Sequence, residues 1–163
     1  AGISLGHTRD FTPIAAFKKL YDVNVLANHA ILEVLLPKMQ KRQSGTIVFI
    51  SSLASLFSMP SSKVYSSSKR ALNAYAEGLR YRVKCDNIKA INILPGFIKS
   101  ELTDKNEFKM PFLLETEDGV RRMVNAINRG KEFYAFPRRF YYLIKLFGIL
   151  PAFIHTFVVK KFS

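Results

Sequence analysis

Two short runs rich in β-branched and apolar residues, 46–50 and 88–94, constrain the fold of this chain more than any other feature. The first run, Thr-Ile-Val-Phe-Ile, does not alternate apolar with polar residues, which is typical of a strand buried on both faces of a parallel sheet. A Ser-rich stretch over 51–62 predicts a loop, and a helix is predicted over 63–84. Pro95-Gly96 then ends the second strand. This order predicts two parallel strands joined by a crossover helix.

The stretch before the first strand is predicted to be helical. Thr12 and Pro13 are residue types that begin helices, Thr as the N-cap and Pro at the first helical position. Apolar residues then continue to about Arg42 and cover several helical faces, so we expect a largely buried helix. Pro37 is expected to kink or end it.

A third helix is predicted to begin at Thr116, where two acidic residues follow, and to close at Gly130. A short strand follows over 133–136. The alternation of helix and strand predicts an α/β fold, a partial doubly wound parallel sheet with helices on both faces.

Charge and cysteine content limit the class of protein. The 163 residues carry 25 Lys and Arg against 12 Asp and Glu, a net charge of +13. These charges are mostly scattered, without a block of five or more basic residues, so nucleic-acid binding is supported by the charge alone and is not predicted. The single cysteine, Cys85, allows no internal disulfide and fits a reducing, cytoplasmic compartment. His7, His29 and His155 show no metal-ligand spacing, so no metal site is predicted.

Tyr65 and Lys69 are the first candidates for chemistry. Four residues are about one helical turn, so both side chains lie on one face of the predicted helix. A free tyrosine has a pKa near 10, and a nearby ammonium favours the phenolate and lowers that pKa. Such a tyrosine can exchange a proton with an alcohol or ketone oxygen. The spacing alone is a weak signal, because Tyr141 and Lys145 repeat it.

Ser52 distinguishes the two pairs. It lies thirteen residues before Tyr65, directly after the first strand, whereas Asn128 holds that position before Tyr141, within a predicted helix. Open α/β sheets bind ligands at the carboxyl ends of their strands, so the Ser52 hydroxyl can donate a hydrogen bond to a substrate carbonyl there.

In this order, the residues resemble the short-chain dehydrogenase/reductase family, whose fold is Rossmann-like. Besides Ser52, Tyr65 and Lys69, the matching motifs are the run 45–52, the run 95–100 (Pro-Gly-Phe-Ile-Lys-Ser), the run 22–25 (Asp-Val-Asn-Val) and Ala1-Gly2 at the start. The resemblance covers about residues 1–136.

The resemblance implies an NAD(P)-dependent oxidoreductase that interconverts an alcohol and a ketone. Tyr65 would be the general acid/base, Lys69 would lower its pKa and bind the nicotinamide ribose, and Ser52 would polarise the substrate carbonyl. Asn24 would hold, through its backbone, a water that relays protons to Lys69. The cofactor would contact Tyr65, Lys69, Gly2, Pro95, Gly96, Ile98 and Ser100, where Ser100 replaces the commoner threonine.

The family's Gly-rich turn, which cradles the pyrophosphate, has no counterpart in this sequence. We therefore expect residues 1–136 to be the catalytic half of the domain, the dinucleotide-binding half to be absent, and this chain alone to be inactive. NADP is slightly favoured over NAD, although the residues that choose between them would lie in the absent half. The alternative is a non-catalytic binding or scaffold protein on a truncated fold of this family.

Residues 137–163 are expected to form a basic and apolar helical extension. Its apolar stretch 140–159 lies between the basic pairs 138–139 and 160–161. Lys145 and Pro151 argue against a membrane span, which leaves a substrate lid, a subunit contact or a pair of short helices on a membrane surface, through residues 138–161, as the main alternatives.

Two further expectations concern partners. The apolar segment 97–114 suggests a small hydrophobic alcohol or ketone, such as a lipid-like or steroid-like molecule. The helices at 21–42 and 63–84 are candidates for contacts in a homo-oligomer.

Overall fold

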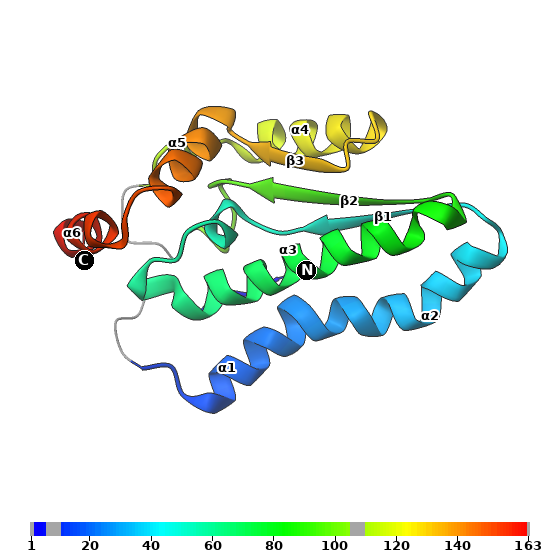
Figure 1. Ribbon diagram of the computed structural model, residues 1–163, viewed down its shortest axis with the longest axis horizontal. Coiled ribbons are helices and arrows are strands. Elements are labelled where there is room, and N and C mark those ends of the chain that lie inside the picture. The colour runs from blue at the N-terminus through cyan, green and yellow to red at the C-terminus, as the bar shows by residue number, and fades with distance from the viewer. Residues whose placement is uncertain (1, 6–10, 105–109, 163) are drawn as a thin grey trace.

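The computed structural model describes residues 2–5, 11–104 and 110–162, so Ala1, His7 and Phe108 lie outside the described part. A three-stranded parallel sheet, in the order β1-β2-β3, lies between helices (Figure 1). The elements are α1 (Ile14–Tyr21), the π-helical segment η1 (Asp22–Leu26), α2 (Ala27–Lys41), β1 (Gly45–Ile50), the short 3-10 helices η2 (Leu53–Ser55) and η3 (Pro60–Ser62), α3 (Lys63–Val83), the 3-10 helix η4 (Lys84–Asp86), β2 (Ile88–Pro95), α4 (Thr116–Asn128), β3 (Phe133–Phe136), α5 (Arg138–Gly148) and α6 (Ala152–Phe162).

Both faces of the sheet are buried. Phe49 of β1 and Ala90 of β2 pack with Leu72 and Ala76 of α3 on one face. On the other face, side chains of β2 and β3 pack with those of α4: Ile91, Ile93, Phe136, Met123 and Ile127. Because successive residues of a strand point to opposite faces, strands covered on both sides need apolar residues at nearly every position. The α/β fold with helices on both faces is therefore confirmed.

The N-terminal helices differ from their prediction. Helix α1 begins at Ile14, and Pro13 rather than Thr12 occupies the capping position. Pro37 does not end the helix, because α2 continues to Lys41. The predicted stretch is thus one continuous helical path, interrupted by η1.

The prediction that this helix is largely buried is wrong. Leu32 is the one buried residue of α2, and it packs with the cluster between α3 and the sheet. Other apolar side chains of this region are 40–59% exposed: Leu26, Ile31, Val34 and Leu35. The apolar residues of this helical stretch lie on more than one helix face, and α3 packs against only one of those faces.

The C-terminal extension forms two short helices, α5 and α6. Helix α5 packs three side chains, Phe140, Tyr141 and Ile144, against the body of the protein. They contact Leu53 of η2, Leu94 of β2 and Ala135 of β3. Among the described residues, no helix is long and apolar enough to cross a membrane.

Candidate active site

Ser52, Tyr65 and Lys69 meet at the carboxyl end of β1. Ser52 follows β1 and caps η2, where its Oγ accepts a hydrogen bond of 3.1 Å from the Ala54 amide. The same side chain is hydrogen-bonded to the phenol of Tyr65, which lies in the first turn of α3. Because the Ala54 amide occupies the acceptor side of the hydroxyl, the Ser52 proton can be given to an oxygen in the site.

Two opposing effects act on the pKa of Tyr65. Burial raises it, and the hydrogen bond to Ser52 lowers it by less, so the pKa lies above its usual value. This direction is opposite to the one expected from the neighbouring ammonium. At neutral pH, Tyr65 is therefore a phenol that holds its proton.

Lys69 is a buried ammonium. Its residue is 4% exposed, and its Nζ donates a hydrogen bond of 3.0 Å to the Ile50 carbonyl. Burial lowers the pKa of Lys69 to about 8. Within residues 2–5, 11–104 and 110–162, Lys69 forms no ion pair with a carboxylate.

The local geometry of the Tyr-Lys pair does not by itself mark the site. Lys69 Nζ lies 5.8 Å from the Tyr65 ring centroid, and Lys145 Nζ lies 5.9 Å from that of Tyr141. The two pairs differ in surroundings, because Lys145 is exposed whereas Lys69 is buried at the end of a strand beside Ser52.

Asn24 is fully buried in η1 and fastens the N-terminal segment. Its Oδ1 accepts from the Ile3 amide at 2.8 Å, and its Nδ2 donates to the Ile3 carbonyl at 3.0 Å and to Ser68 Oγ at 3.1 Å. Its backbone carbonyl accepts a hydrogen bond of 3.0 Å from the Asn28 side chain. The π-helical turn was not predicted, although such turns occur often at functional sites. The water expected on the Asn24 backbone stays a prediction.

Gly2 is held against this pair. A Cβ at Gly2 would lie 3.3 Å from Lys69 Nζ and 3.4 Å from Asn24 Oδ1, so a side chain there would crowd both groups. The structure thus brings Gly2 close to Lys69, and the cofactor contact expected of both residues stays a prediction.

The turn after β2 places the remaining predicted residues. The Gly96 amide donates to the Phe136 carbonyl at 2.7 Å, and a Cβ at Gly96 would meet Leu53, the residue after Ser52, at 3.3 Å. Pro95 ends β2 and is buried, and Ile98 packs against the cluster under α4. Pro95-Gly96 therefore lies beside the part of the site that contains Ser52.

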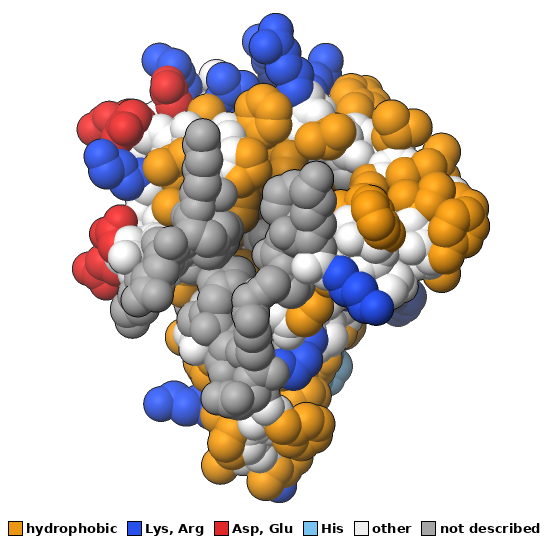
Figure 2. Space-filling view, turned by 90° about the vertical axis from the view of Figure 1, so that its left-hand side faces the viewer, with side chains coloured by type: hydrophobic (Ala, Val, Ile, Leu, Met, Phe, Trp, Pro, Cys, Tyr) orange, Lys and Arg blue, Asp and Glu red, His pale blue; other side chains and the backbone are white. Residues whose placement is uncertain are grey.

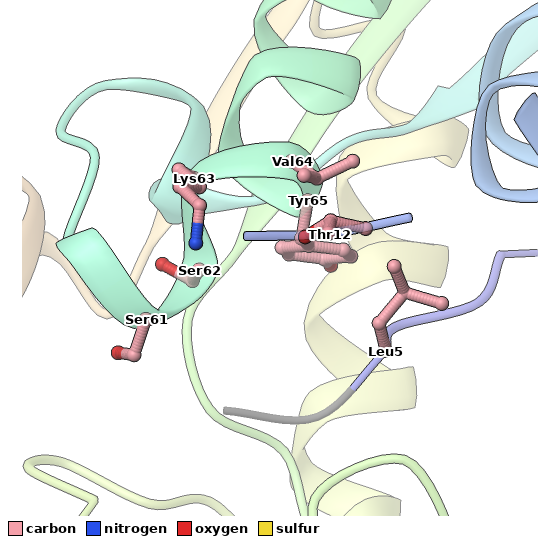
Figure 3. Close-up of a pocket in the computed structure, with 7 residues that line it drawn as sticks. All are labelled: Leu5, Thr12, Ser61, Ser62, Lys63, Val64 and Tyr65. Atoms are coloured by element: carbon pink, nitrogen blue, oxygen red, sulfur yellow. The ribbon is translucent and has the colours of Figure 1, made fainter. Parts of the chain in front are cut away.

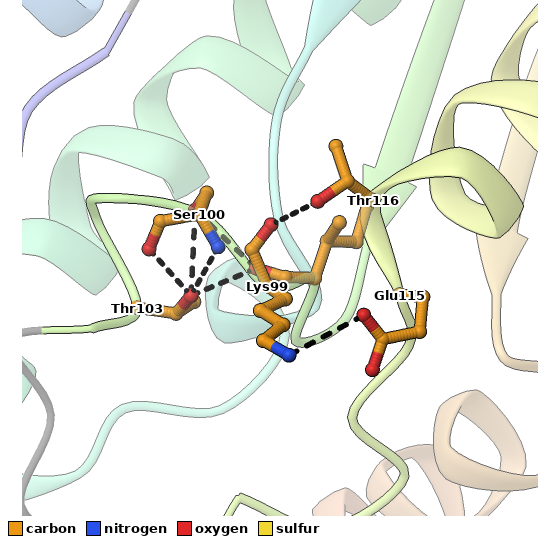
Figure 4. Close-up of polar contacts among 6 residues, drawn as sticks. Lys99, Ser100, Thr103, Glu115 and Thr116 are labelled. Carbon is orange, nitrogen blue, oxygen red and sulfur yellow. Dashed lines mark hydrogen bonds and ion pairs between the residues drawn. The ribbon is translucent and has the colours of Figure 1, made fainter.

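Ser100 belongs to a compact turn that Figure 4 shows. Its amide donates to Thr103 Oγ1 at 2.8 Å, and Thr103 is buried. Nearby, the Thr116 hydroxyl donates to the Lys99 carbonyl at 2.7 Å, and Lys99 pairs with Glu115 at 3.5 Å. Thr103 was missed by the sequence analysis, although a hydroxyl three residues after Ser100 is a signal of such a turn.

A chain of side-chain hydrogen bonds also holds the backbone carbonyl of Ser52 in place. Ser55 Oγ donates to the Ser52 carbonyl at 2.5 Å, and Asn73 Nδ2 donates to Ser55 Oγ at 2.5 Å. Asn92 Nδ2 of β2 donates to Asn73 Oδ1 at 3.0 Å. The sequence analysis did not find these residues, because no motif joins them.

A small pocket lies beside Tyr65 (Figure 3). It is lined by Leu5 and Thr12 of the N-terminal segment, by Ser61 and Ser62 of η3, and by the first residues of α3, 63–65. Tyr65 therefore forms part of a pocket wall.

A family model for the short chain dehydrogenases matches residues 1–110. The chain belongs to this family. An uncharacterized oxidoreductase of Myxococcus xanthus is 37% identical over 139 residues, which cover 85% of this chain and 55% of that protein. The "NADPH-dependent 1-acyldihydroxyacetone phosphate reductase" of Saccharomyces cerevisiae is 36% identical over 91 residues, 56% of this chain and 30% of that protein.

Solved structures agree with this assignment. ElxO with NADP bound is 29% identical, with a TM-score of 0.70 over 83% of this chain and 61% of that one. The short-chain dehydrogenase chain described here spans about half, or less, of the length of the curated relatives that it matches.

The donor set at Lys69 fits a ribose of a nicotinamide dinucleotide. An ammonium has three hydrogens, and within the described part of the chain Nζ donates one of them, to Ile50. A buried cation without a carboxylate partner is best satisfied by neutral acceptors, and ribose hydroxyls are such acceptors. In this family member, Lys69 would hold the ribose, with Gly2, Pro95, Gly96, Ile98 and Ser100 around the nicotinamide.

Proposed function

We propose that this chain carries the catalytic machinery of an NAD(P)-dependent oxidoreductase that interconverts an alcohol and a ketone. The observation that carries the proposal is the hydrogen bond between Ser52 and Tyr65 at the end of β1, with the buried ammonium of Lys69 one turn further along α3. The bound nicotinamide supplies or accepts the hydride.

Each residue has a task at the substrate oxygen. Ser52 donates a hydrogen bond to the carbonyl oxygen, and Tyr65 gives its proton to that oxygen as negative charge develops there. Lys69, with its pKa lowered to about 8, stabilises the phenolate formed on Tyr65 and can return a proton near neutral pH. The raised pKa of Tyr65 keeps the proton in place beforehand, which suits reduction of a ketone.

Tyr65→Phe in the native protein that carries this sequence tests the proposal. We expect turnover to fall by about 10²–10⁴-fold, while dinucleotide affinity changes little. Tyr141→Phe removes the hydroxyl of the second Tyr-Lys pair and should leave turnover unchanged. Full turnover in Tyr65→Phe would overturn the proposal and favour a binding or scaffold protein on this fold.

We further propose a hydrophobic substrate and NADP as the preferred cofactor. After β2, Phe97 stacks on Phe140 at a centroid distance of 6.0 Å, and Phe112 packs against Phe140 in a tilted arrangement at 5.6 Å. The loop beside the site is therefore aromatic. The yeast relative is named as an NADPH-dependent reductase of an acylated ketone, and ElxO binds NADP. Turnover of a series of ketones with lengthening alkyl chains, with NADPH and NADH, checks both points; a preference for short polar ketones or for NADH contradicts them.

The exposed apolar side of α2 supports a contact between identical subunits. Ile31 and Val34 are 58% and 59% exposed, and Tyr81 of α3 is 63% exposed. Ile31→Glu together with Val34→Glu should lower the assembly state seen by light scattering. An unchanged mass would remove these helices from the subunit contact.

A further inference from the structure

We propose that the outer surface of α5 and α6 binds the face of an anionic lipid bilayer. Tyr142, Leu143, Leu146 and Ile149 recur at the three- and four-residue spacing of one helix face, yet this face is turned to solvent. These four residues, with Phe153 and Phe157 of α6, are 55–77% exposed. We call these six side chains the outer stripe.

The outer stripe is not the packing face of α5. Phe140, Tyr141 and Ile144 already occupy that face, where they cover Leu53, Leu94 and Ala135. Helix α5 is therefore apolar on two sides, whereas a helix on the surface of a globular protein needs one apolar side only. An exposed second apolar side of this kind marks a contact with another apolar surface, of a protein or of a membrane.

The two helices are held in a fixed arrangement. His155 of α6 lies with its Nε2 2.6 Å from the Phe147 carbonyl of α5, and the Phe147 and His155 rings are 4.7 Å apart. Phe57, from the loop after β1, packs edge-on to both rings. The outer stripe is thus carried by a helix pair that is anchored to the body of the protein.

The charge of the C-terminal region, from residue 133 onward, favours an anionic partner for the outer stripe. From residue 133 to the last residue, the sequence contains five basic residues and no acidic one: Arg138, Arg139, Lys145, Lys160 and Lys161. In Figure 2, which looks at this end of the molecule, broad hydrophobic areas have basic side chains at several of their edges, and acidic side chains lie at the upper left. Aromatic and aliphatic side chains beside lysine and arginine match the headgroup level of an anionic bilayer.

A second copy of the chain fits this surface less well. Two copies that met through the outer stripe would bring like-charged edges together, and the whole chain carries a net charge of +13. Each helix has 11 residues, about half of what a bilayer span requires, so both lie along the surface of the bilayer.

Flotation of the native protein with lipid vesicles tests the proposal without reference to turnover. We expect binding to vesicles of phosphatidylcholine with about one third phosphatidylserine, and at least tenfold weaker binding to pure phosphatidylcholine or in high salt. Leu146→Glu with Ile149→Glu should reduce binding at least tenfold, because both side chains leave the apolar interface. Both are exposed in the free protein, so the thermal midpoint should change little.

Two further variants separate the contribution of charge to vesicle binding from that of the apolar side chains. Arg139→Gln with Lys145→Gln should remove the preference for phosphatidylserine, while the apolar contact stays. Val120→Glu with Val124→Glu places two glutamates on exposed apolar positions of α4, 46% and 47% exposed, and should leave vesicle binding unchanged. Absence of binding to anionic vesicles overturns the proposal. Equal loss of binding in the α4 variant also overturns it. A lower assembly state in the Leu146 and Ile149 variant overturns it too, because that result would assign the outer stripe to a second copy.

Discussion

Replacing Lys69 by methionine should stabilise the fold while it abolishes the proposed activity. Burial lowers the pKa of this ammonium from 10.5 to about 8. The shift means that the charged form is disfavoured in the folded protein relative to the unfolded chain. Methionine has a similar length and carries no charge, so it can fill the same space without that cost.

The size of the effect follows from the two pKa values. A pKa difference of about 2.5, at about 1.4 kcal/mol for each pH unit, gives a cost of about 3.5 kcal/mol, which is complete below pH 8. Between pH 8 and 10.5 the unfolded chain holds more protons than the folded one, so the free energy of unfolding rises with pH. Methionine also loses the hydrogen bond to Ile50, worth about 1 kcal/mol. The net gain at pH 7 is therefore about 2.5 kcal/mol.

Denaturant unfolding of the nucleotide-free protein at several pH values measures this gain. We expect Lys69→Met to be more stable than the unsubstituted protein at pH 7, and the difference to shrink as pH rises from 8 to 10.5. Lys84→Met removes an exposed lysine just after the same helix and controls for the loss of a positive charge. A variant that is less stable at pH 7, by an amount that does not change with pH, would refute the reasoning that Lys69 is a strained cation.

Three other substitutions test packing around the site. Asn24→Ala should cost about 2–4 kcal/mol in the free energy of unfolding, because it leaves the Ile3 amide and carbonyl without their partner. Gly119→Ala should cost about 1–3 kcal/mol, since its Cβ would lie 2.6 Å from Ile98 Cδ1. Phe136→Ala should cost about 3–5 kcal/mol, because its buried ring fills the space between β3 and α4. Thermal or denaturant unfolding measures all three, and losses below about 0.5 kcal/mol contradict the contacts described.

Much of the fold could be predicted because its signals are local. The apolar runs at β1 and β2 and the turn at Gly130, whose φ is +60°, appear directly in the sequence. The meeting of Ser52 with Tyr65 also follows, because a crossover helix that returns beside its own strand brings the loop and the first turn together.

Other features depend on what surrounds a residue. Leucines and valines of α2 look alike in the sequence, and only the position of α3 decides which of them are covered. The direction of the Tyr65 pKa depends on how much its burial outweighs a hydrogen bond, which no spacing reveals. The hydrogen bonds from Asn92 through Asn73 to Ser55 join three separate elements, so they required the folded chain.

Helix α5 has a consequence for where the proposed site would lie when the protein is bound to a membrane. The inner ring of Phe140 touches Phe97 and Phe112, while the outer stripe begins two residues later on the same short helix. Adsorption through the outer stripe would therefore hold the aromatic loop within one helix diameter, roughly 10 Å, of the bilayer surface. An apolar ketone dissolved in the membrane would then reach the proposed site over a short path, so we expect vesicles to raise turnover of membrane-dissolved ketones and not that of water-soluble ones.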